Sequence, residues 1–178
     1  PGVDPDALKE PGSTIEETRA DLFALYYLAD PKMVELGLID SPEAYKAQYY
    51  SYLLNGLMTQ LRRIEPGKEV EESHMRNRKL ISEWVFEHGK ADNVVEIEKI
   101  DGKTYLKIND YEAVRRLFGE LLAEIQRVRS EGDYATASAL VQDYAVKVDP
   151  ELHAEILSRY APLNIAPYRG FVNPVYTP

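Results

Sequence analysis

Three carboxylates of types able to bind a metal or move a proton fall close together near the start of the chain. With Ser13, Glu16 matches a capping box and lies at the positive end of the helix dipole, which gives it a structural explanation. Helical spacing places Glu17 and Asp21 on one stripe, whose later members are apolar. These two carboxylates are thus expected to face the core, where a charge must be paired or metal-bound. On spacing alone, a buried ion pair remains the simpler interpretation.

The remaining candidates for chemistry are three histidines, His74, His88 and His153, because the chain contains no cysteine. Disulfides, thiolate metal sites and cysteine nucleophiles are therefore excluded, which leaves oxygen and imidazole. His74 has helical spacing to Ile81 and Val85, a position typical of a core histidine. No pattern in the residues themselves gives His88 or His153 a functional role.

Longer phrases extend the pattern along the chain. The hexapeptide Glu16–Asp21 reads Glu-Glu-Thr-Arg-Ala-Asp. It is followed by the phrases Phe23–Tyr27, Asn55–Met58, His74–Arg78 and Ala166–Pro174. This ordered series resembles bacterial members of the dipeptidyl peptidase III family of zinc peptidases, whose second signature is Glu-Glu-x-x-Ala-Asp/Glu, downstream of a His-Glu-x-x-Gly-His helix. The resemblance spans nearly the whole chain.

The resemblance implies roles for the acidic hexapeptide and for one histidine. Glu17 corresponds to the third zinc ligand of the family, and Glu16 and Asp21 to the carboxylates that orient the two zinc histidines. His74 lies in a His-Met-x-x-Arg phrase, which implies a catalytic histidine that hydrogen-bonds the substrate or stabilises the transition state. Arg78, one helical turn later, is expected to support it.

Two further residues are weaker candidates for substrate binding. Arg159 loosely resembles a basic position near the substrate cleft of the family, and a cation at the end of a helix explains it equally well. Ser13 is a candidate for substrate contact in addition to helix capping, with capping ranked first.

The chain departs from the family pattern because none of its histidines lies in a His-Glu-x-x-Gly-His phrase. Two zinc ligands and the general-base glutamate are therefore missing. Together with a first residue that is not methionine, this predicts a C-terminal fragment that begins just after that motif. We expect the fragment alone to be inactive.

Composition narrows the class of protein. The chain has 178 residues, of which 44% are hydrophobic, and a formal net charge of -9. This is sufficient for one ordinary core, and the negative charge disfavours nucleic acid as a partner. No apolar run predicts a membrane span or a signal peptide. The absence of cysteine favours a cytoplasmic location.

The spacing of apolar residues and turn signals predicts a mainly α-helical domain with one β-hairpin insert and an extended C-terminal tail. Asp101-Gly102 is a typical hairpin turn. The expected organisation is a linker over 1–12, a helical zinc-lobe fragment over 13–160 and a tail over 161–178. Within it we expect the hairpin at 94–108 and helices at 13–30, 41–64, 69–86, 111–130, 132–146 and 150–160.

Three functions follow from these patterns. The first, which the family resemblance implies, is part of a zinc exopeptidase that releases dipeptides from the N-termini of short peptides, with the remainder of the parent chain as its partner. The second is a non-catalytic, acidic helical module that binds another protein. The third is a self-standing site for a hard cation, built from Glu16, Glu17 and Asp21 without histidine.

Overall fold

The computed structural model describes residues 3–4 and 6–165. In chain order its elements are α1 (Gly12–Leu28), α2 (Pro31–Glu35), α3 (Ala44–Leu57), the 3-10 helix η1 (Thr59–Arg63), α4 (Ser73–His88), β1 (Val95–Ile100), β2 (Lys103–Ile108), α5 (Tyr111–Glu131), α6 (Tyr134–Tyr144), α7 (Pro150–Tyr160) and the 3-10 helix η2 (Ala161–Leu163). The mainly α-helical fold with a single hairpin among the described residues is the one that the sequence predicts.

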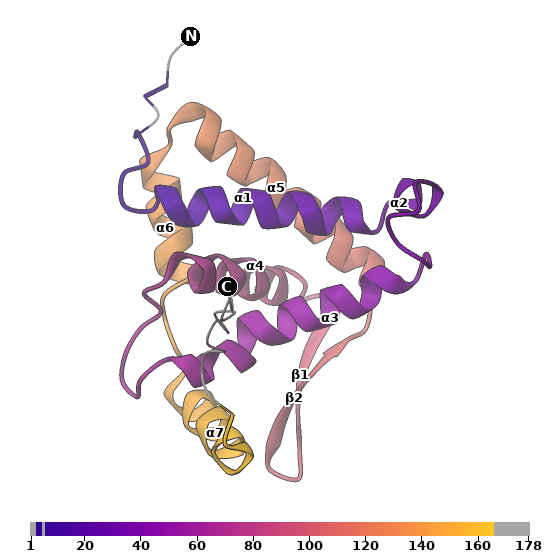
Figure 1. The fold of residues 1–178 in the computed structure, drawn as a ribbon. Helices are drawn as coiled ribbons and strands as arrows, with labels where there is room; N and C mark the ends of the chain where they lie inside the picture. Colours follow the sequence, from indigo (N-terminus) through magenta and orange to yellow (C-terminus); the bar gives the residue numbers. More distant parts are fainter. Residues whose placement is uncertain (1–2, 5, 166–178) are drawn as a thin grey trace, which may run out of the picture.

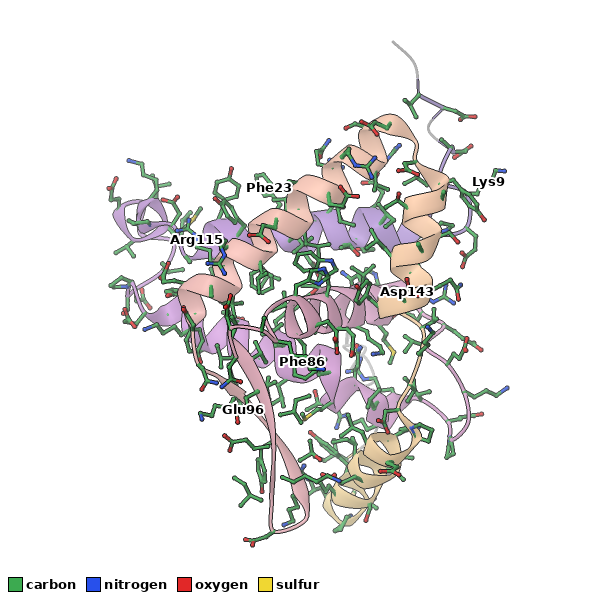
Figure 2. All side chains as sticks on the ribbon, turned by 180° about the vertical axis from the view of Figure 1, so that it is seen from behind. Lys9, Phe23, Phe86, Glu96, Arg115 and Asp143 are labelled. Atoms are coloured by element: carbon green, nitrogen blue, oxygen red, sulfur yellow. The ribbon has the colours of Figure 1, made fainter. Side chains whose placement is uncertain are left out.

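The helix α4 lies at the centre of the fold. It packs against α1, α3, α5 and α6, while α1 and α5 pack side by side on one side of it (Figure 1). The hairpin and α7 lie at the other end of the molecule (Figure 1). Side chains fill the space between the helices (Figure 2), and the fully buried ones include Leu22 of α1, Ile81 of α4 and Phe118 of α5. Burial of these apolar faces is what holds the helices in place.

Aspartates begin the last three long helices. The side chain of Asp110 accepts a hydrogen bond from the Ala113 amide, and Asp133 and Asp149 cap α6 and α7 in the same way. Each satisfies amides that the helix leaves without an internal partner.

The predicted hairpin is present between α4 and α5. Its strands are antiparallel, with Val95 opposite Ile108 and Ile100 opposite Lys103. At the turn, Asp101 and Gly102 have φ values of 50° and 75°. Two consecutive positive φ angles are what the two-residue hairpin turn requires, and an Asp-Gly pair tolerates them.

The predicted helix over 41–64 is wrong in extent, because α3 ends at Leu57 and a 3-10 turn follows. The break occurs at Met58, whose φ and ψ are -134° and -63°. Buried Gln60 stabilises it by donating from Nε2 to the carbonyl oxygens of Gly56 and Met75. A buried side-chain amide thus replaces helical hydrogen bonds and ties the end of α3 to α4.

Other differences lie at helix ends. The predicted helix over 69–86 begins later, at Ser73, because the Glu72 carboxylate accepts hydrogen bonds from the amides of His74 and Met75. The short helix α2 was not predicted at all. Among the described residues, no helix is long and apolar enough to cross a membrane. The predicted tail lies largely outside the described residues, as does the phrase Ala166–Pro174.

Candidate functional site

Two of the predicted site residues, Glu17 and His74, form a pair between α1 and α4. Their side chains approach to 3.2 Å, between Oε2 of Glu17 and Nδ1 of His74. The side chains are 36% and 57% exposed. The expectation that His74 is a core histidine is therefore wrong, and the pair is open to solvent and to a ligand.

The core-facing stripe of α1 also differs from the predicted one. The helix buries Thr14, Ile15, Thr18, Leu22 and Leu25. Glu17 and Asp21 lie at the edge of this face and are only partly buried. The expectation that both carboxylates face the core is wrong, because the buried stripe is turned by about one residue from the one that the spacing indicated.

The first turn of α4 places His74 next to α1. Glu72 caps this helix, and one of its oxygens lies 2.9 Å from the backbone amide of His74. The following residue, Met75, is buried. A fixed backbone and a buried neighbour leave His74 on the outer side of the turn, where it meets Glu17.

Asp21 is held by two neutral donors from two other helices. The hydroxyl of Tyr52 on α3 and Nδ2 of Asn77 on α4 each donate to Oδ2 of Asp21, both at 2.8 Å. Burial, and next the Asp21 charge, hold the pKa of Tyr52 well above its usual range. Tyr52 therefore stays protonated and keeps donating over the physiological pH range.

A close crossing of α3 and α4 brings Tyr52 and Asn77 together. At the crossing, a Cβ added to Gly56 would lie 2.1 Å from Oγ of Ser82 and 2.4 Å from the carbonyl oxygen of Arg78. Only glycine fits between these atoms. Since Tyr52 lies one turn before Gly56, the crossing sets how far its hydroxyl reaches towards α1.

Glu16 is engaged by arginines on both oxygens. Its Oε2 accepts from Arg19 at 2.9 Å, and its Oε1 pairs with Arg129 of α5. Burial alone would raise the pKa of Glu16, but the hydrogen bonds from the two arginines outweigh it and hold the pKa below its usual value. The predicted capping box is wrong: α1 begins after Pro11, so Ser13 lies inside the helix and makes no cap.

The other substrate-binding candidates are separated in the structure. Arg78 lies one turn after His74, close enough for its positive charge to oppose the rise in the pKa of Tyr52. Ser13 is exposed and lines a shallow pocket with Glu16 and Arg129. Arg78 therefore lies beside the Asp21 cluster, whereas Ser13 lies near the start of α1.

The structure does not bring Arg159 to this region. Arg159 lies on α7, at the end of the molecule away from α1 (Figure 1). Its guanidinium donates to the carbonyl oxygen of Thr104 at 2.7 Å, pairs with Glu155 and lies over the ring of Tyr105. These contacts tie α7 to the hairpin and are those of a structural cation.

The two other histidines have structural partners. His153 is 4% exposed, and its Nε2 lies 3.0 Å from the carbonyl oxygens of Leu61 and Ile64. His88 stacks on Trp84 with 3.8 Å between ring centroids. Both contacts agree with the absence of any functional pattern around these residues.

Sequence reasoning missed Tyr52, Asn77 and Glu72 as members of this region. A signal for Asn77 was present, because it shares a helical stripe with Ile81 and Val85, where a polar residue needs a partner. Tyr52 carried no such signal, because which carboxylate its hydroxyl meets depends on how α1 crosses α3.

The described residues do not form a metal site by themselves. No group of three or more His, Asp or Glu side chains among residues 3–4 and 6–165 is placed to hold a metal ion. This overturns the self-standing cation site of Glu16, Glu17 and Asp21, since both oxygens of Glu16 pair with arginine. Glu17 has no Lys or Arg partner within the described part of the chain, where its side chain pairs with His74.

Comparisons with known proteins agree with this fold. The solved structure of DPP III from Caldithrix abyssi matches with a TM-score of 0.64 and 24% sequence identity, over 88% of this chain and 26% of that chain. The chain thus spans about a quarter of that protein. No curated protein sequence gives a significant match. The family model of peptidase family M49 matches residues 6–164, and the chain therefore belongs to peptidase family M49.

Proposed function

We propose that this chain is part of the zinc-binding lobe of a cytoplasmic peptidase that releases dipeptides from the N-termini of short peptides. The observation that carries the proposal is the solvent-open pair of Glu17 and His74 in a chain of a peptidase family. Glu17 is one zinc ligand, and the others come from a segment outside the described residues. The absence of cysteine supports the cytoplasmic location.

When bound, zinc polarises the peptide carbonyl and acidifies a water molecule. The residues of this chain would hold the zinc ion and orient the substrate beside it. Glu17 supplies a carboxylate oxygen, and its position is fixed by the packing of α1 on α4. With Nδ1 turned towards Glu17, His74 has Nε2 left as the ring nitrogen for a substrate oxygen. Arg78 adds positive charge one turn away.

Of the two carboxylates expected to orient zinc histidines, Asp21 has the more suitable surroundings. Its Oδ2 is held by Tyr52 and Asn77, and its Oδ1 accepts no hydrogen bond from the described residues. Both oxygens of Glu16 are already paired with arginine. Glu16 therefore acts on the site through α1 and α5 rather than by direct contact.

The test compares this chain alone with a longer protein that includes a His-Glu-x-x-Gly-His helix. Zinc content and dipeptide release from an arylamide substrate are measured for both, and for Glu17→Ala in the longer protein. We expect zinc and activity only in the longer protein, and loss of both in Glu17→Ala. Glu87→Ala, an exposed glutamate of α4 paired with Lys90, is the matched control and keeps both. Zinc binding and release that survive Glu17→Ala would refute the assignment.

One observation favours the second candidate, a protein-binding module. Phe23 projects from α1 (Figure 2). Phe23 and Tyr27 are 59% and 39% exposed, and their ring centroids are 4.7 Å apart. Exposed aromatic pairs of this kind occur at protein interfaces. A longer protein that binds no zinc, and a Phe23→Ser variant that no longer binds a protein partner, would support this function instead.

A further inference from the structure

We propose that Tyr52 and Asn77 are positioning residues: they hold the Asp21 carboxylate by one oxygen and leave the other free to accept a hydrogen bond from a zinc-ligating imidazole. The inference rests on the proposed function, in which Asp21 orients such a histidine. It assigns roles to two side chains that the acidic hexapeptide does not contain.

The first argument is the geometry of the two donors. Tyr52 comes from α3 and Asn77 from α4, and both donate to Oδ2 of Asp21 at 2.8 Å. Oδ1 accepts no hydrogen bond from the described residues, although a carboxylate oxygen has two lone pairs. Two donors from different directions fix the rotation of the carboxylate, so Oδ1 points in one direction.

The second argument is the unpaired oxygen of Asn77. The side chain is 1% exposed, and its Oδ1 has no hydrogen-bond partner among the described residues. Such a buried, unsatisfied group destabilises the folded state. An apolar side chain of similar shape would avoid this cost, so the buried Oδ1 itself gives no reason for an amide here. Its remaining contribution is the N–H that Asp21 accepts.

The third argument is the charge that the two donors leave on Asp21. Both are neutral, so neither brings a compensating positive charge to the carboxylate, and a hydrogen bond from an imidazole N–H to a charged carboxylate is stronger than one to a neutral acceptor. Asp21 also lies one turn after Glu17 on the same side of α1 and lines a pocket between α1 and α3. A group bound by Glu17 is therefore within reach of Asp21 from the solvent side.

The experiment measures the zinc affinity of the longer protein by competition with a chromophoric chelator, without reference to activity. Tyr52→Phe and Asn77→Leu are each expected to lower the affinity by about 10–100-fold, as loss of a group behind a metal ligand does. Thermal unfolding of the zinc-free Asn77→Leu protein is expected near the parent temperature, because removal of the unpaired oxygen offsets loss of the hydrogen bond to Asp21. Where Asn77→Leu does not fold, Tyr52→Phe, which removes one oxygen atom, decides.

Tyr45→Phe is the matched control. Tyr45 is on the same helix as Tyr52, is buried, and donates its hydroxyl to the Glu112 carboxylate at 2.9 Å. Its loss should leave the zinc affinity unchanged. Equal affinities for Tyr52→Phe and Tyr45→Phe would overturn the positioning role while leaving the proposed function intact if Glu17→Ala still abolishes binding. An unchanged affinity in Glu17→Ala would overturn both.

Discussion

The helix α1 carries two carboxylates, Glu16 and Asp21, that the fold stabilises in opposite ways. Two guanidinium groups neutralise Glu16, and one of them comes from α5. Two neutral groups, from α3 and α4, hold Asp21 and leave its charge in place. The pairing of Glu16 fastens α1 to α5, whereas the hydrogen bonds to Asp21 bring no positive charge to its carboxylate. The kind of donor, rather than the burial of the carboxylate, therefore distinguishes Glu16, which has a structural role, from Asp21, which is a candidate for function.

The largest loss of stability is expected at the crossing of α3 and α4, which supports Asp21 and not Glu16. Gly56→Ala places a methyl group against Ser82 and the Arg78 carbonyl, and overpacking of this kind costs about 1–3 kcal/mol. Urea unfolding should show this loss. Gly12→Ala in α1 is the control, since its added Cβ meets only Leu8 at 3.5 Å. Equal stabilities for the two variants would show that α3 and α4 do not need the close approach that brings Tyr52 and Asn77 to Asp21.

The stability of the protein at alkaline pH tests the hydrogen bond from Tyr52 to Asp21. The pKa of Tyr52 is raised in the folded state, so its contribution to stability is complete below the ordinary value of 10.0 and is lost as the pH rises towards the folded value. Each such group steepens the fall by about 1.4 kcal/mol per pH unit. Unfolding free energies measured between pH 9 and pH 12 should therefore fall less steeply in Tyr52→Phe. An unchanged slope would contradict a buried hydroxyl beside a charged carboxylate.

The smallest effect is expected on the Glu16 side. Because Glu16 is partly exposed, Glu16→Gln should cost no more than about 1 kcal/mol at neutral pH. The pKa of Glu16 is lowered, so its contribution is complete above 4.5 and is lost as the pH falls through the folded value. The variant should thus lose less stability than the parent below pH 4.5, as followed by thermal unfolding. A double-mutant cycle with Arg129→Met measures the pair itself, and zero coupling would show that α1 and α5 do not depend on it.

The sequence was a good guide to elements whose signals are local. Asp110, Asp133 and Asp149 mark helix starts because their side chains bond amides two or three residues away. The turn at Asp101-Gly102 is equally local. The break at Met58 was not predictable, because it depends on Gln60 reaching a carbonyl of α4. Caps and turns formed between neighbouring residues can be predicted from a sequence, whereas helix ends set by tertiary contacts cannot.

The same contrast between local and long-range signals applies to the candidate site. Glu17 and His74 were predicted by resemblance, and the structure brings them together. The hydrogen bonds to Asp21 come from Tyr52 and Asn77, which lie 31 and 56 positions away in the chain. No spacing rule relates such positions. Spacing also misjudged which side of α1 is buried, because an error of one residue in the stripe turns a helix by about 100°.

The contacts of Arg159 and Glu155 with Thr104 affect how cooperatively the hairpin and α7 unfold. A two-stranded ribbon is marginally stable by itself in water. Glu155 accepts from both the amide and the hydroxyl of Thr104, and Arg159 donates to the carbonyl of the same residue. We therefore expect the hairpin and α7 to lose stability together, and amide exchange in β2 to report the persistence of α7.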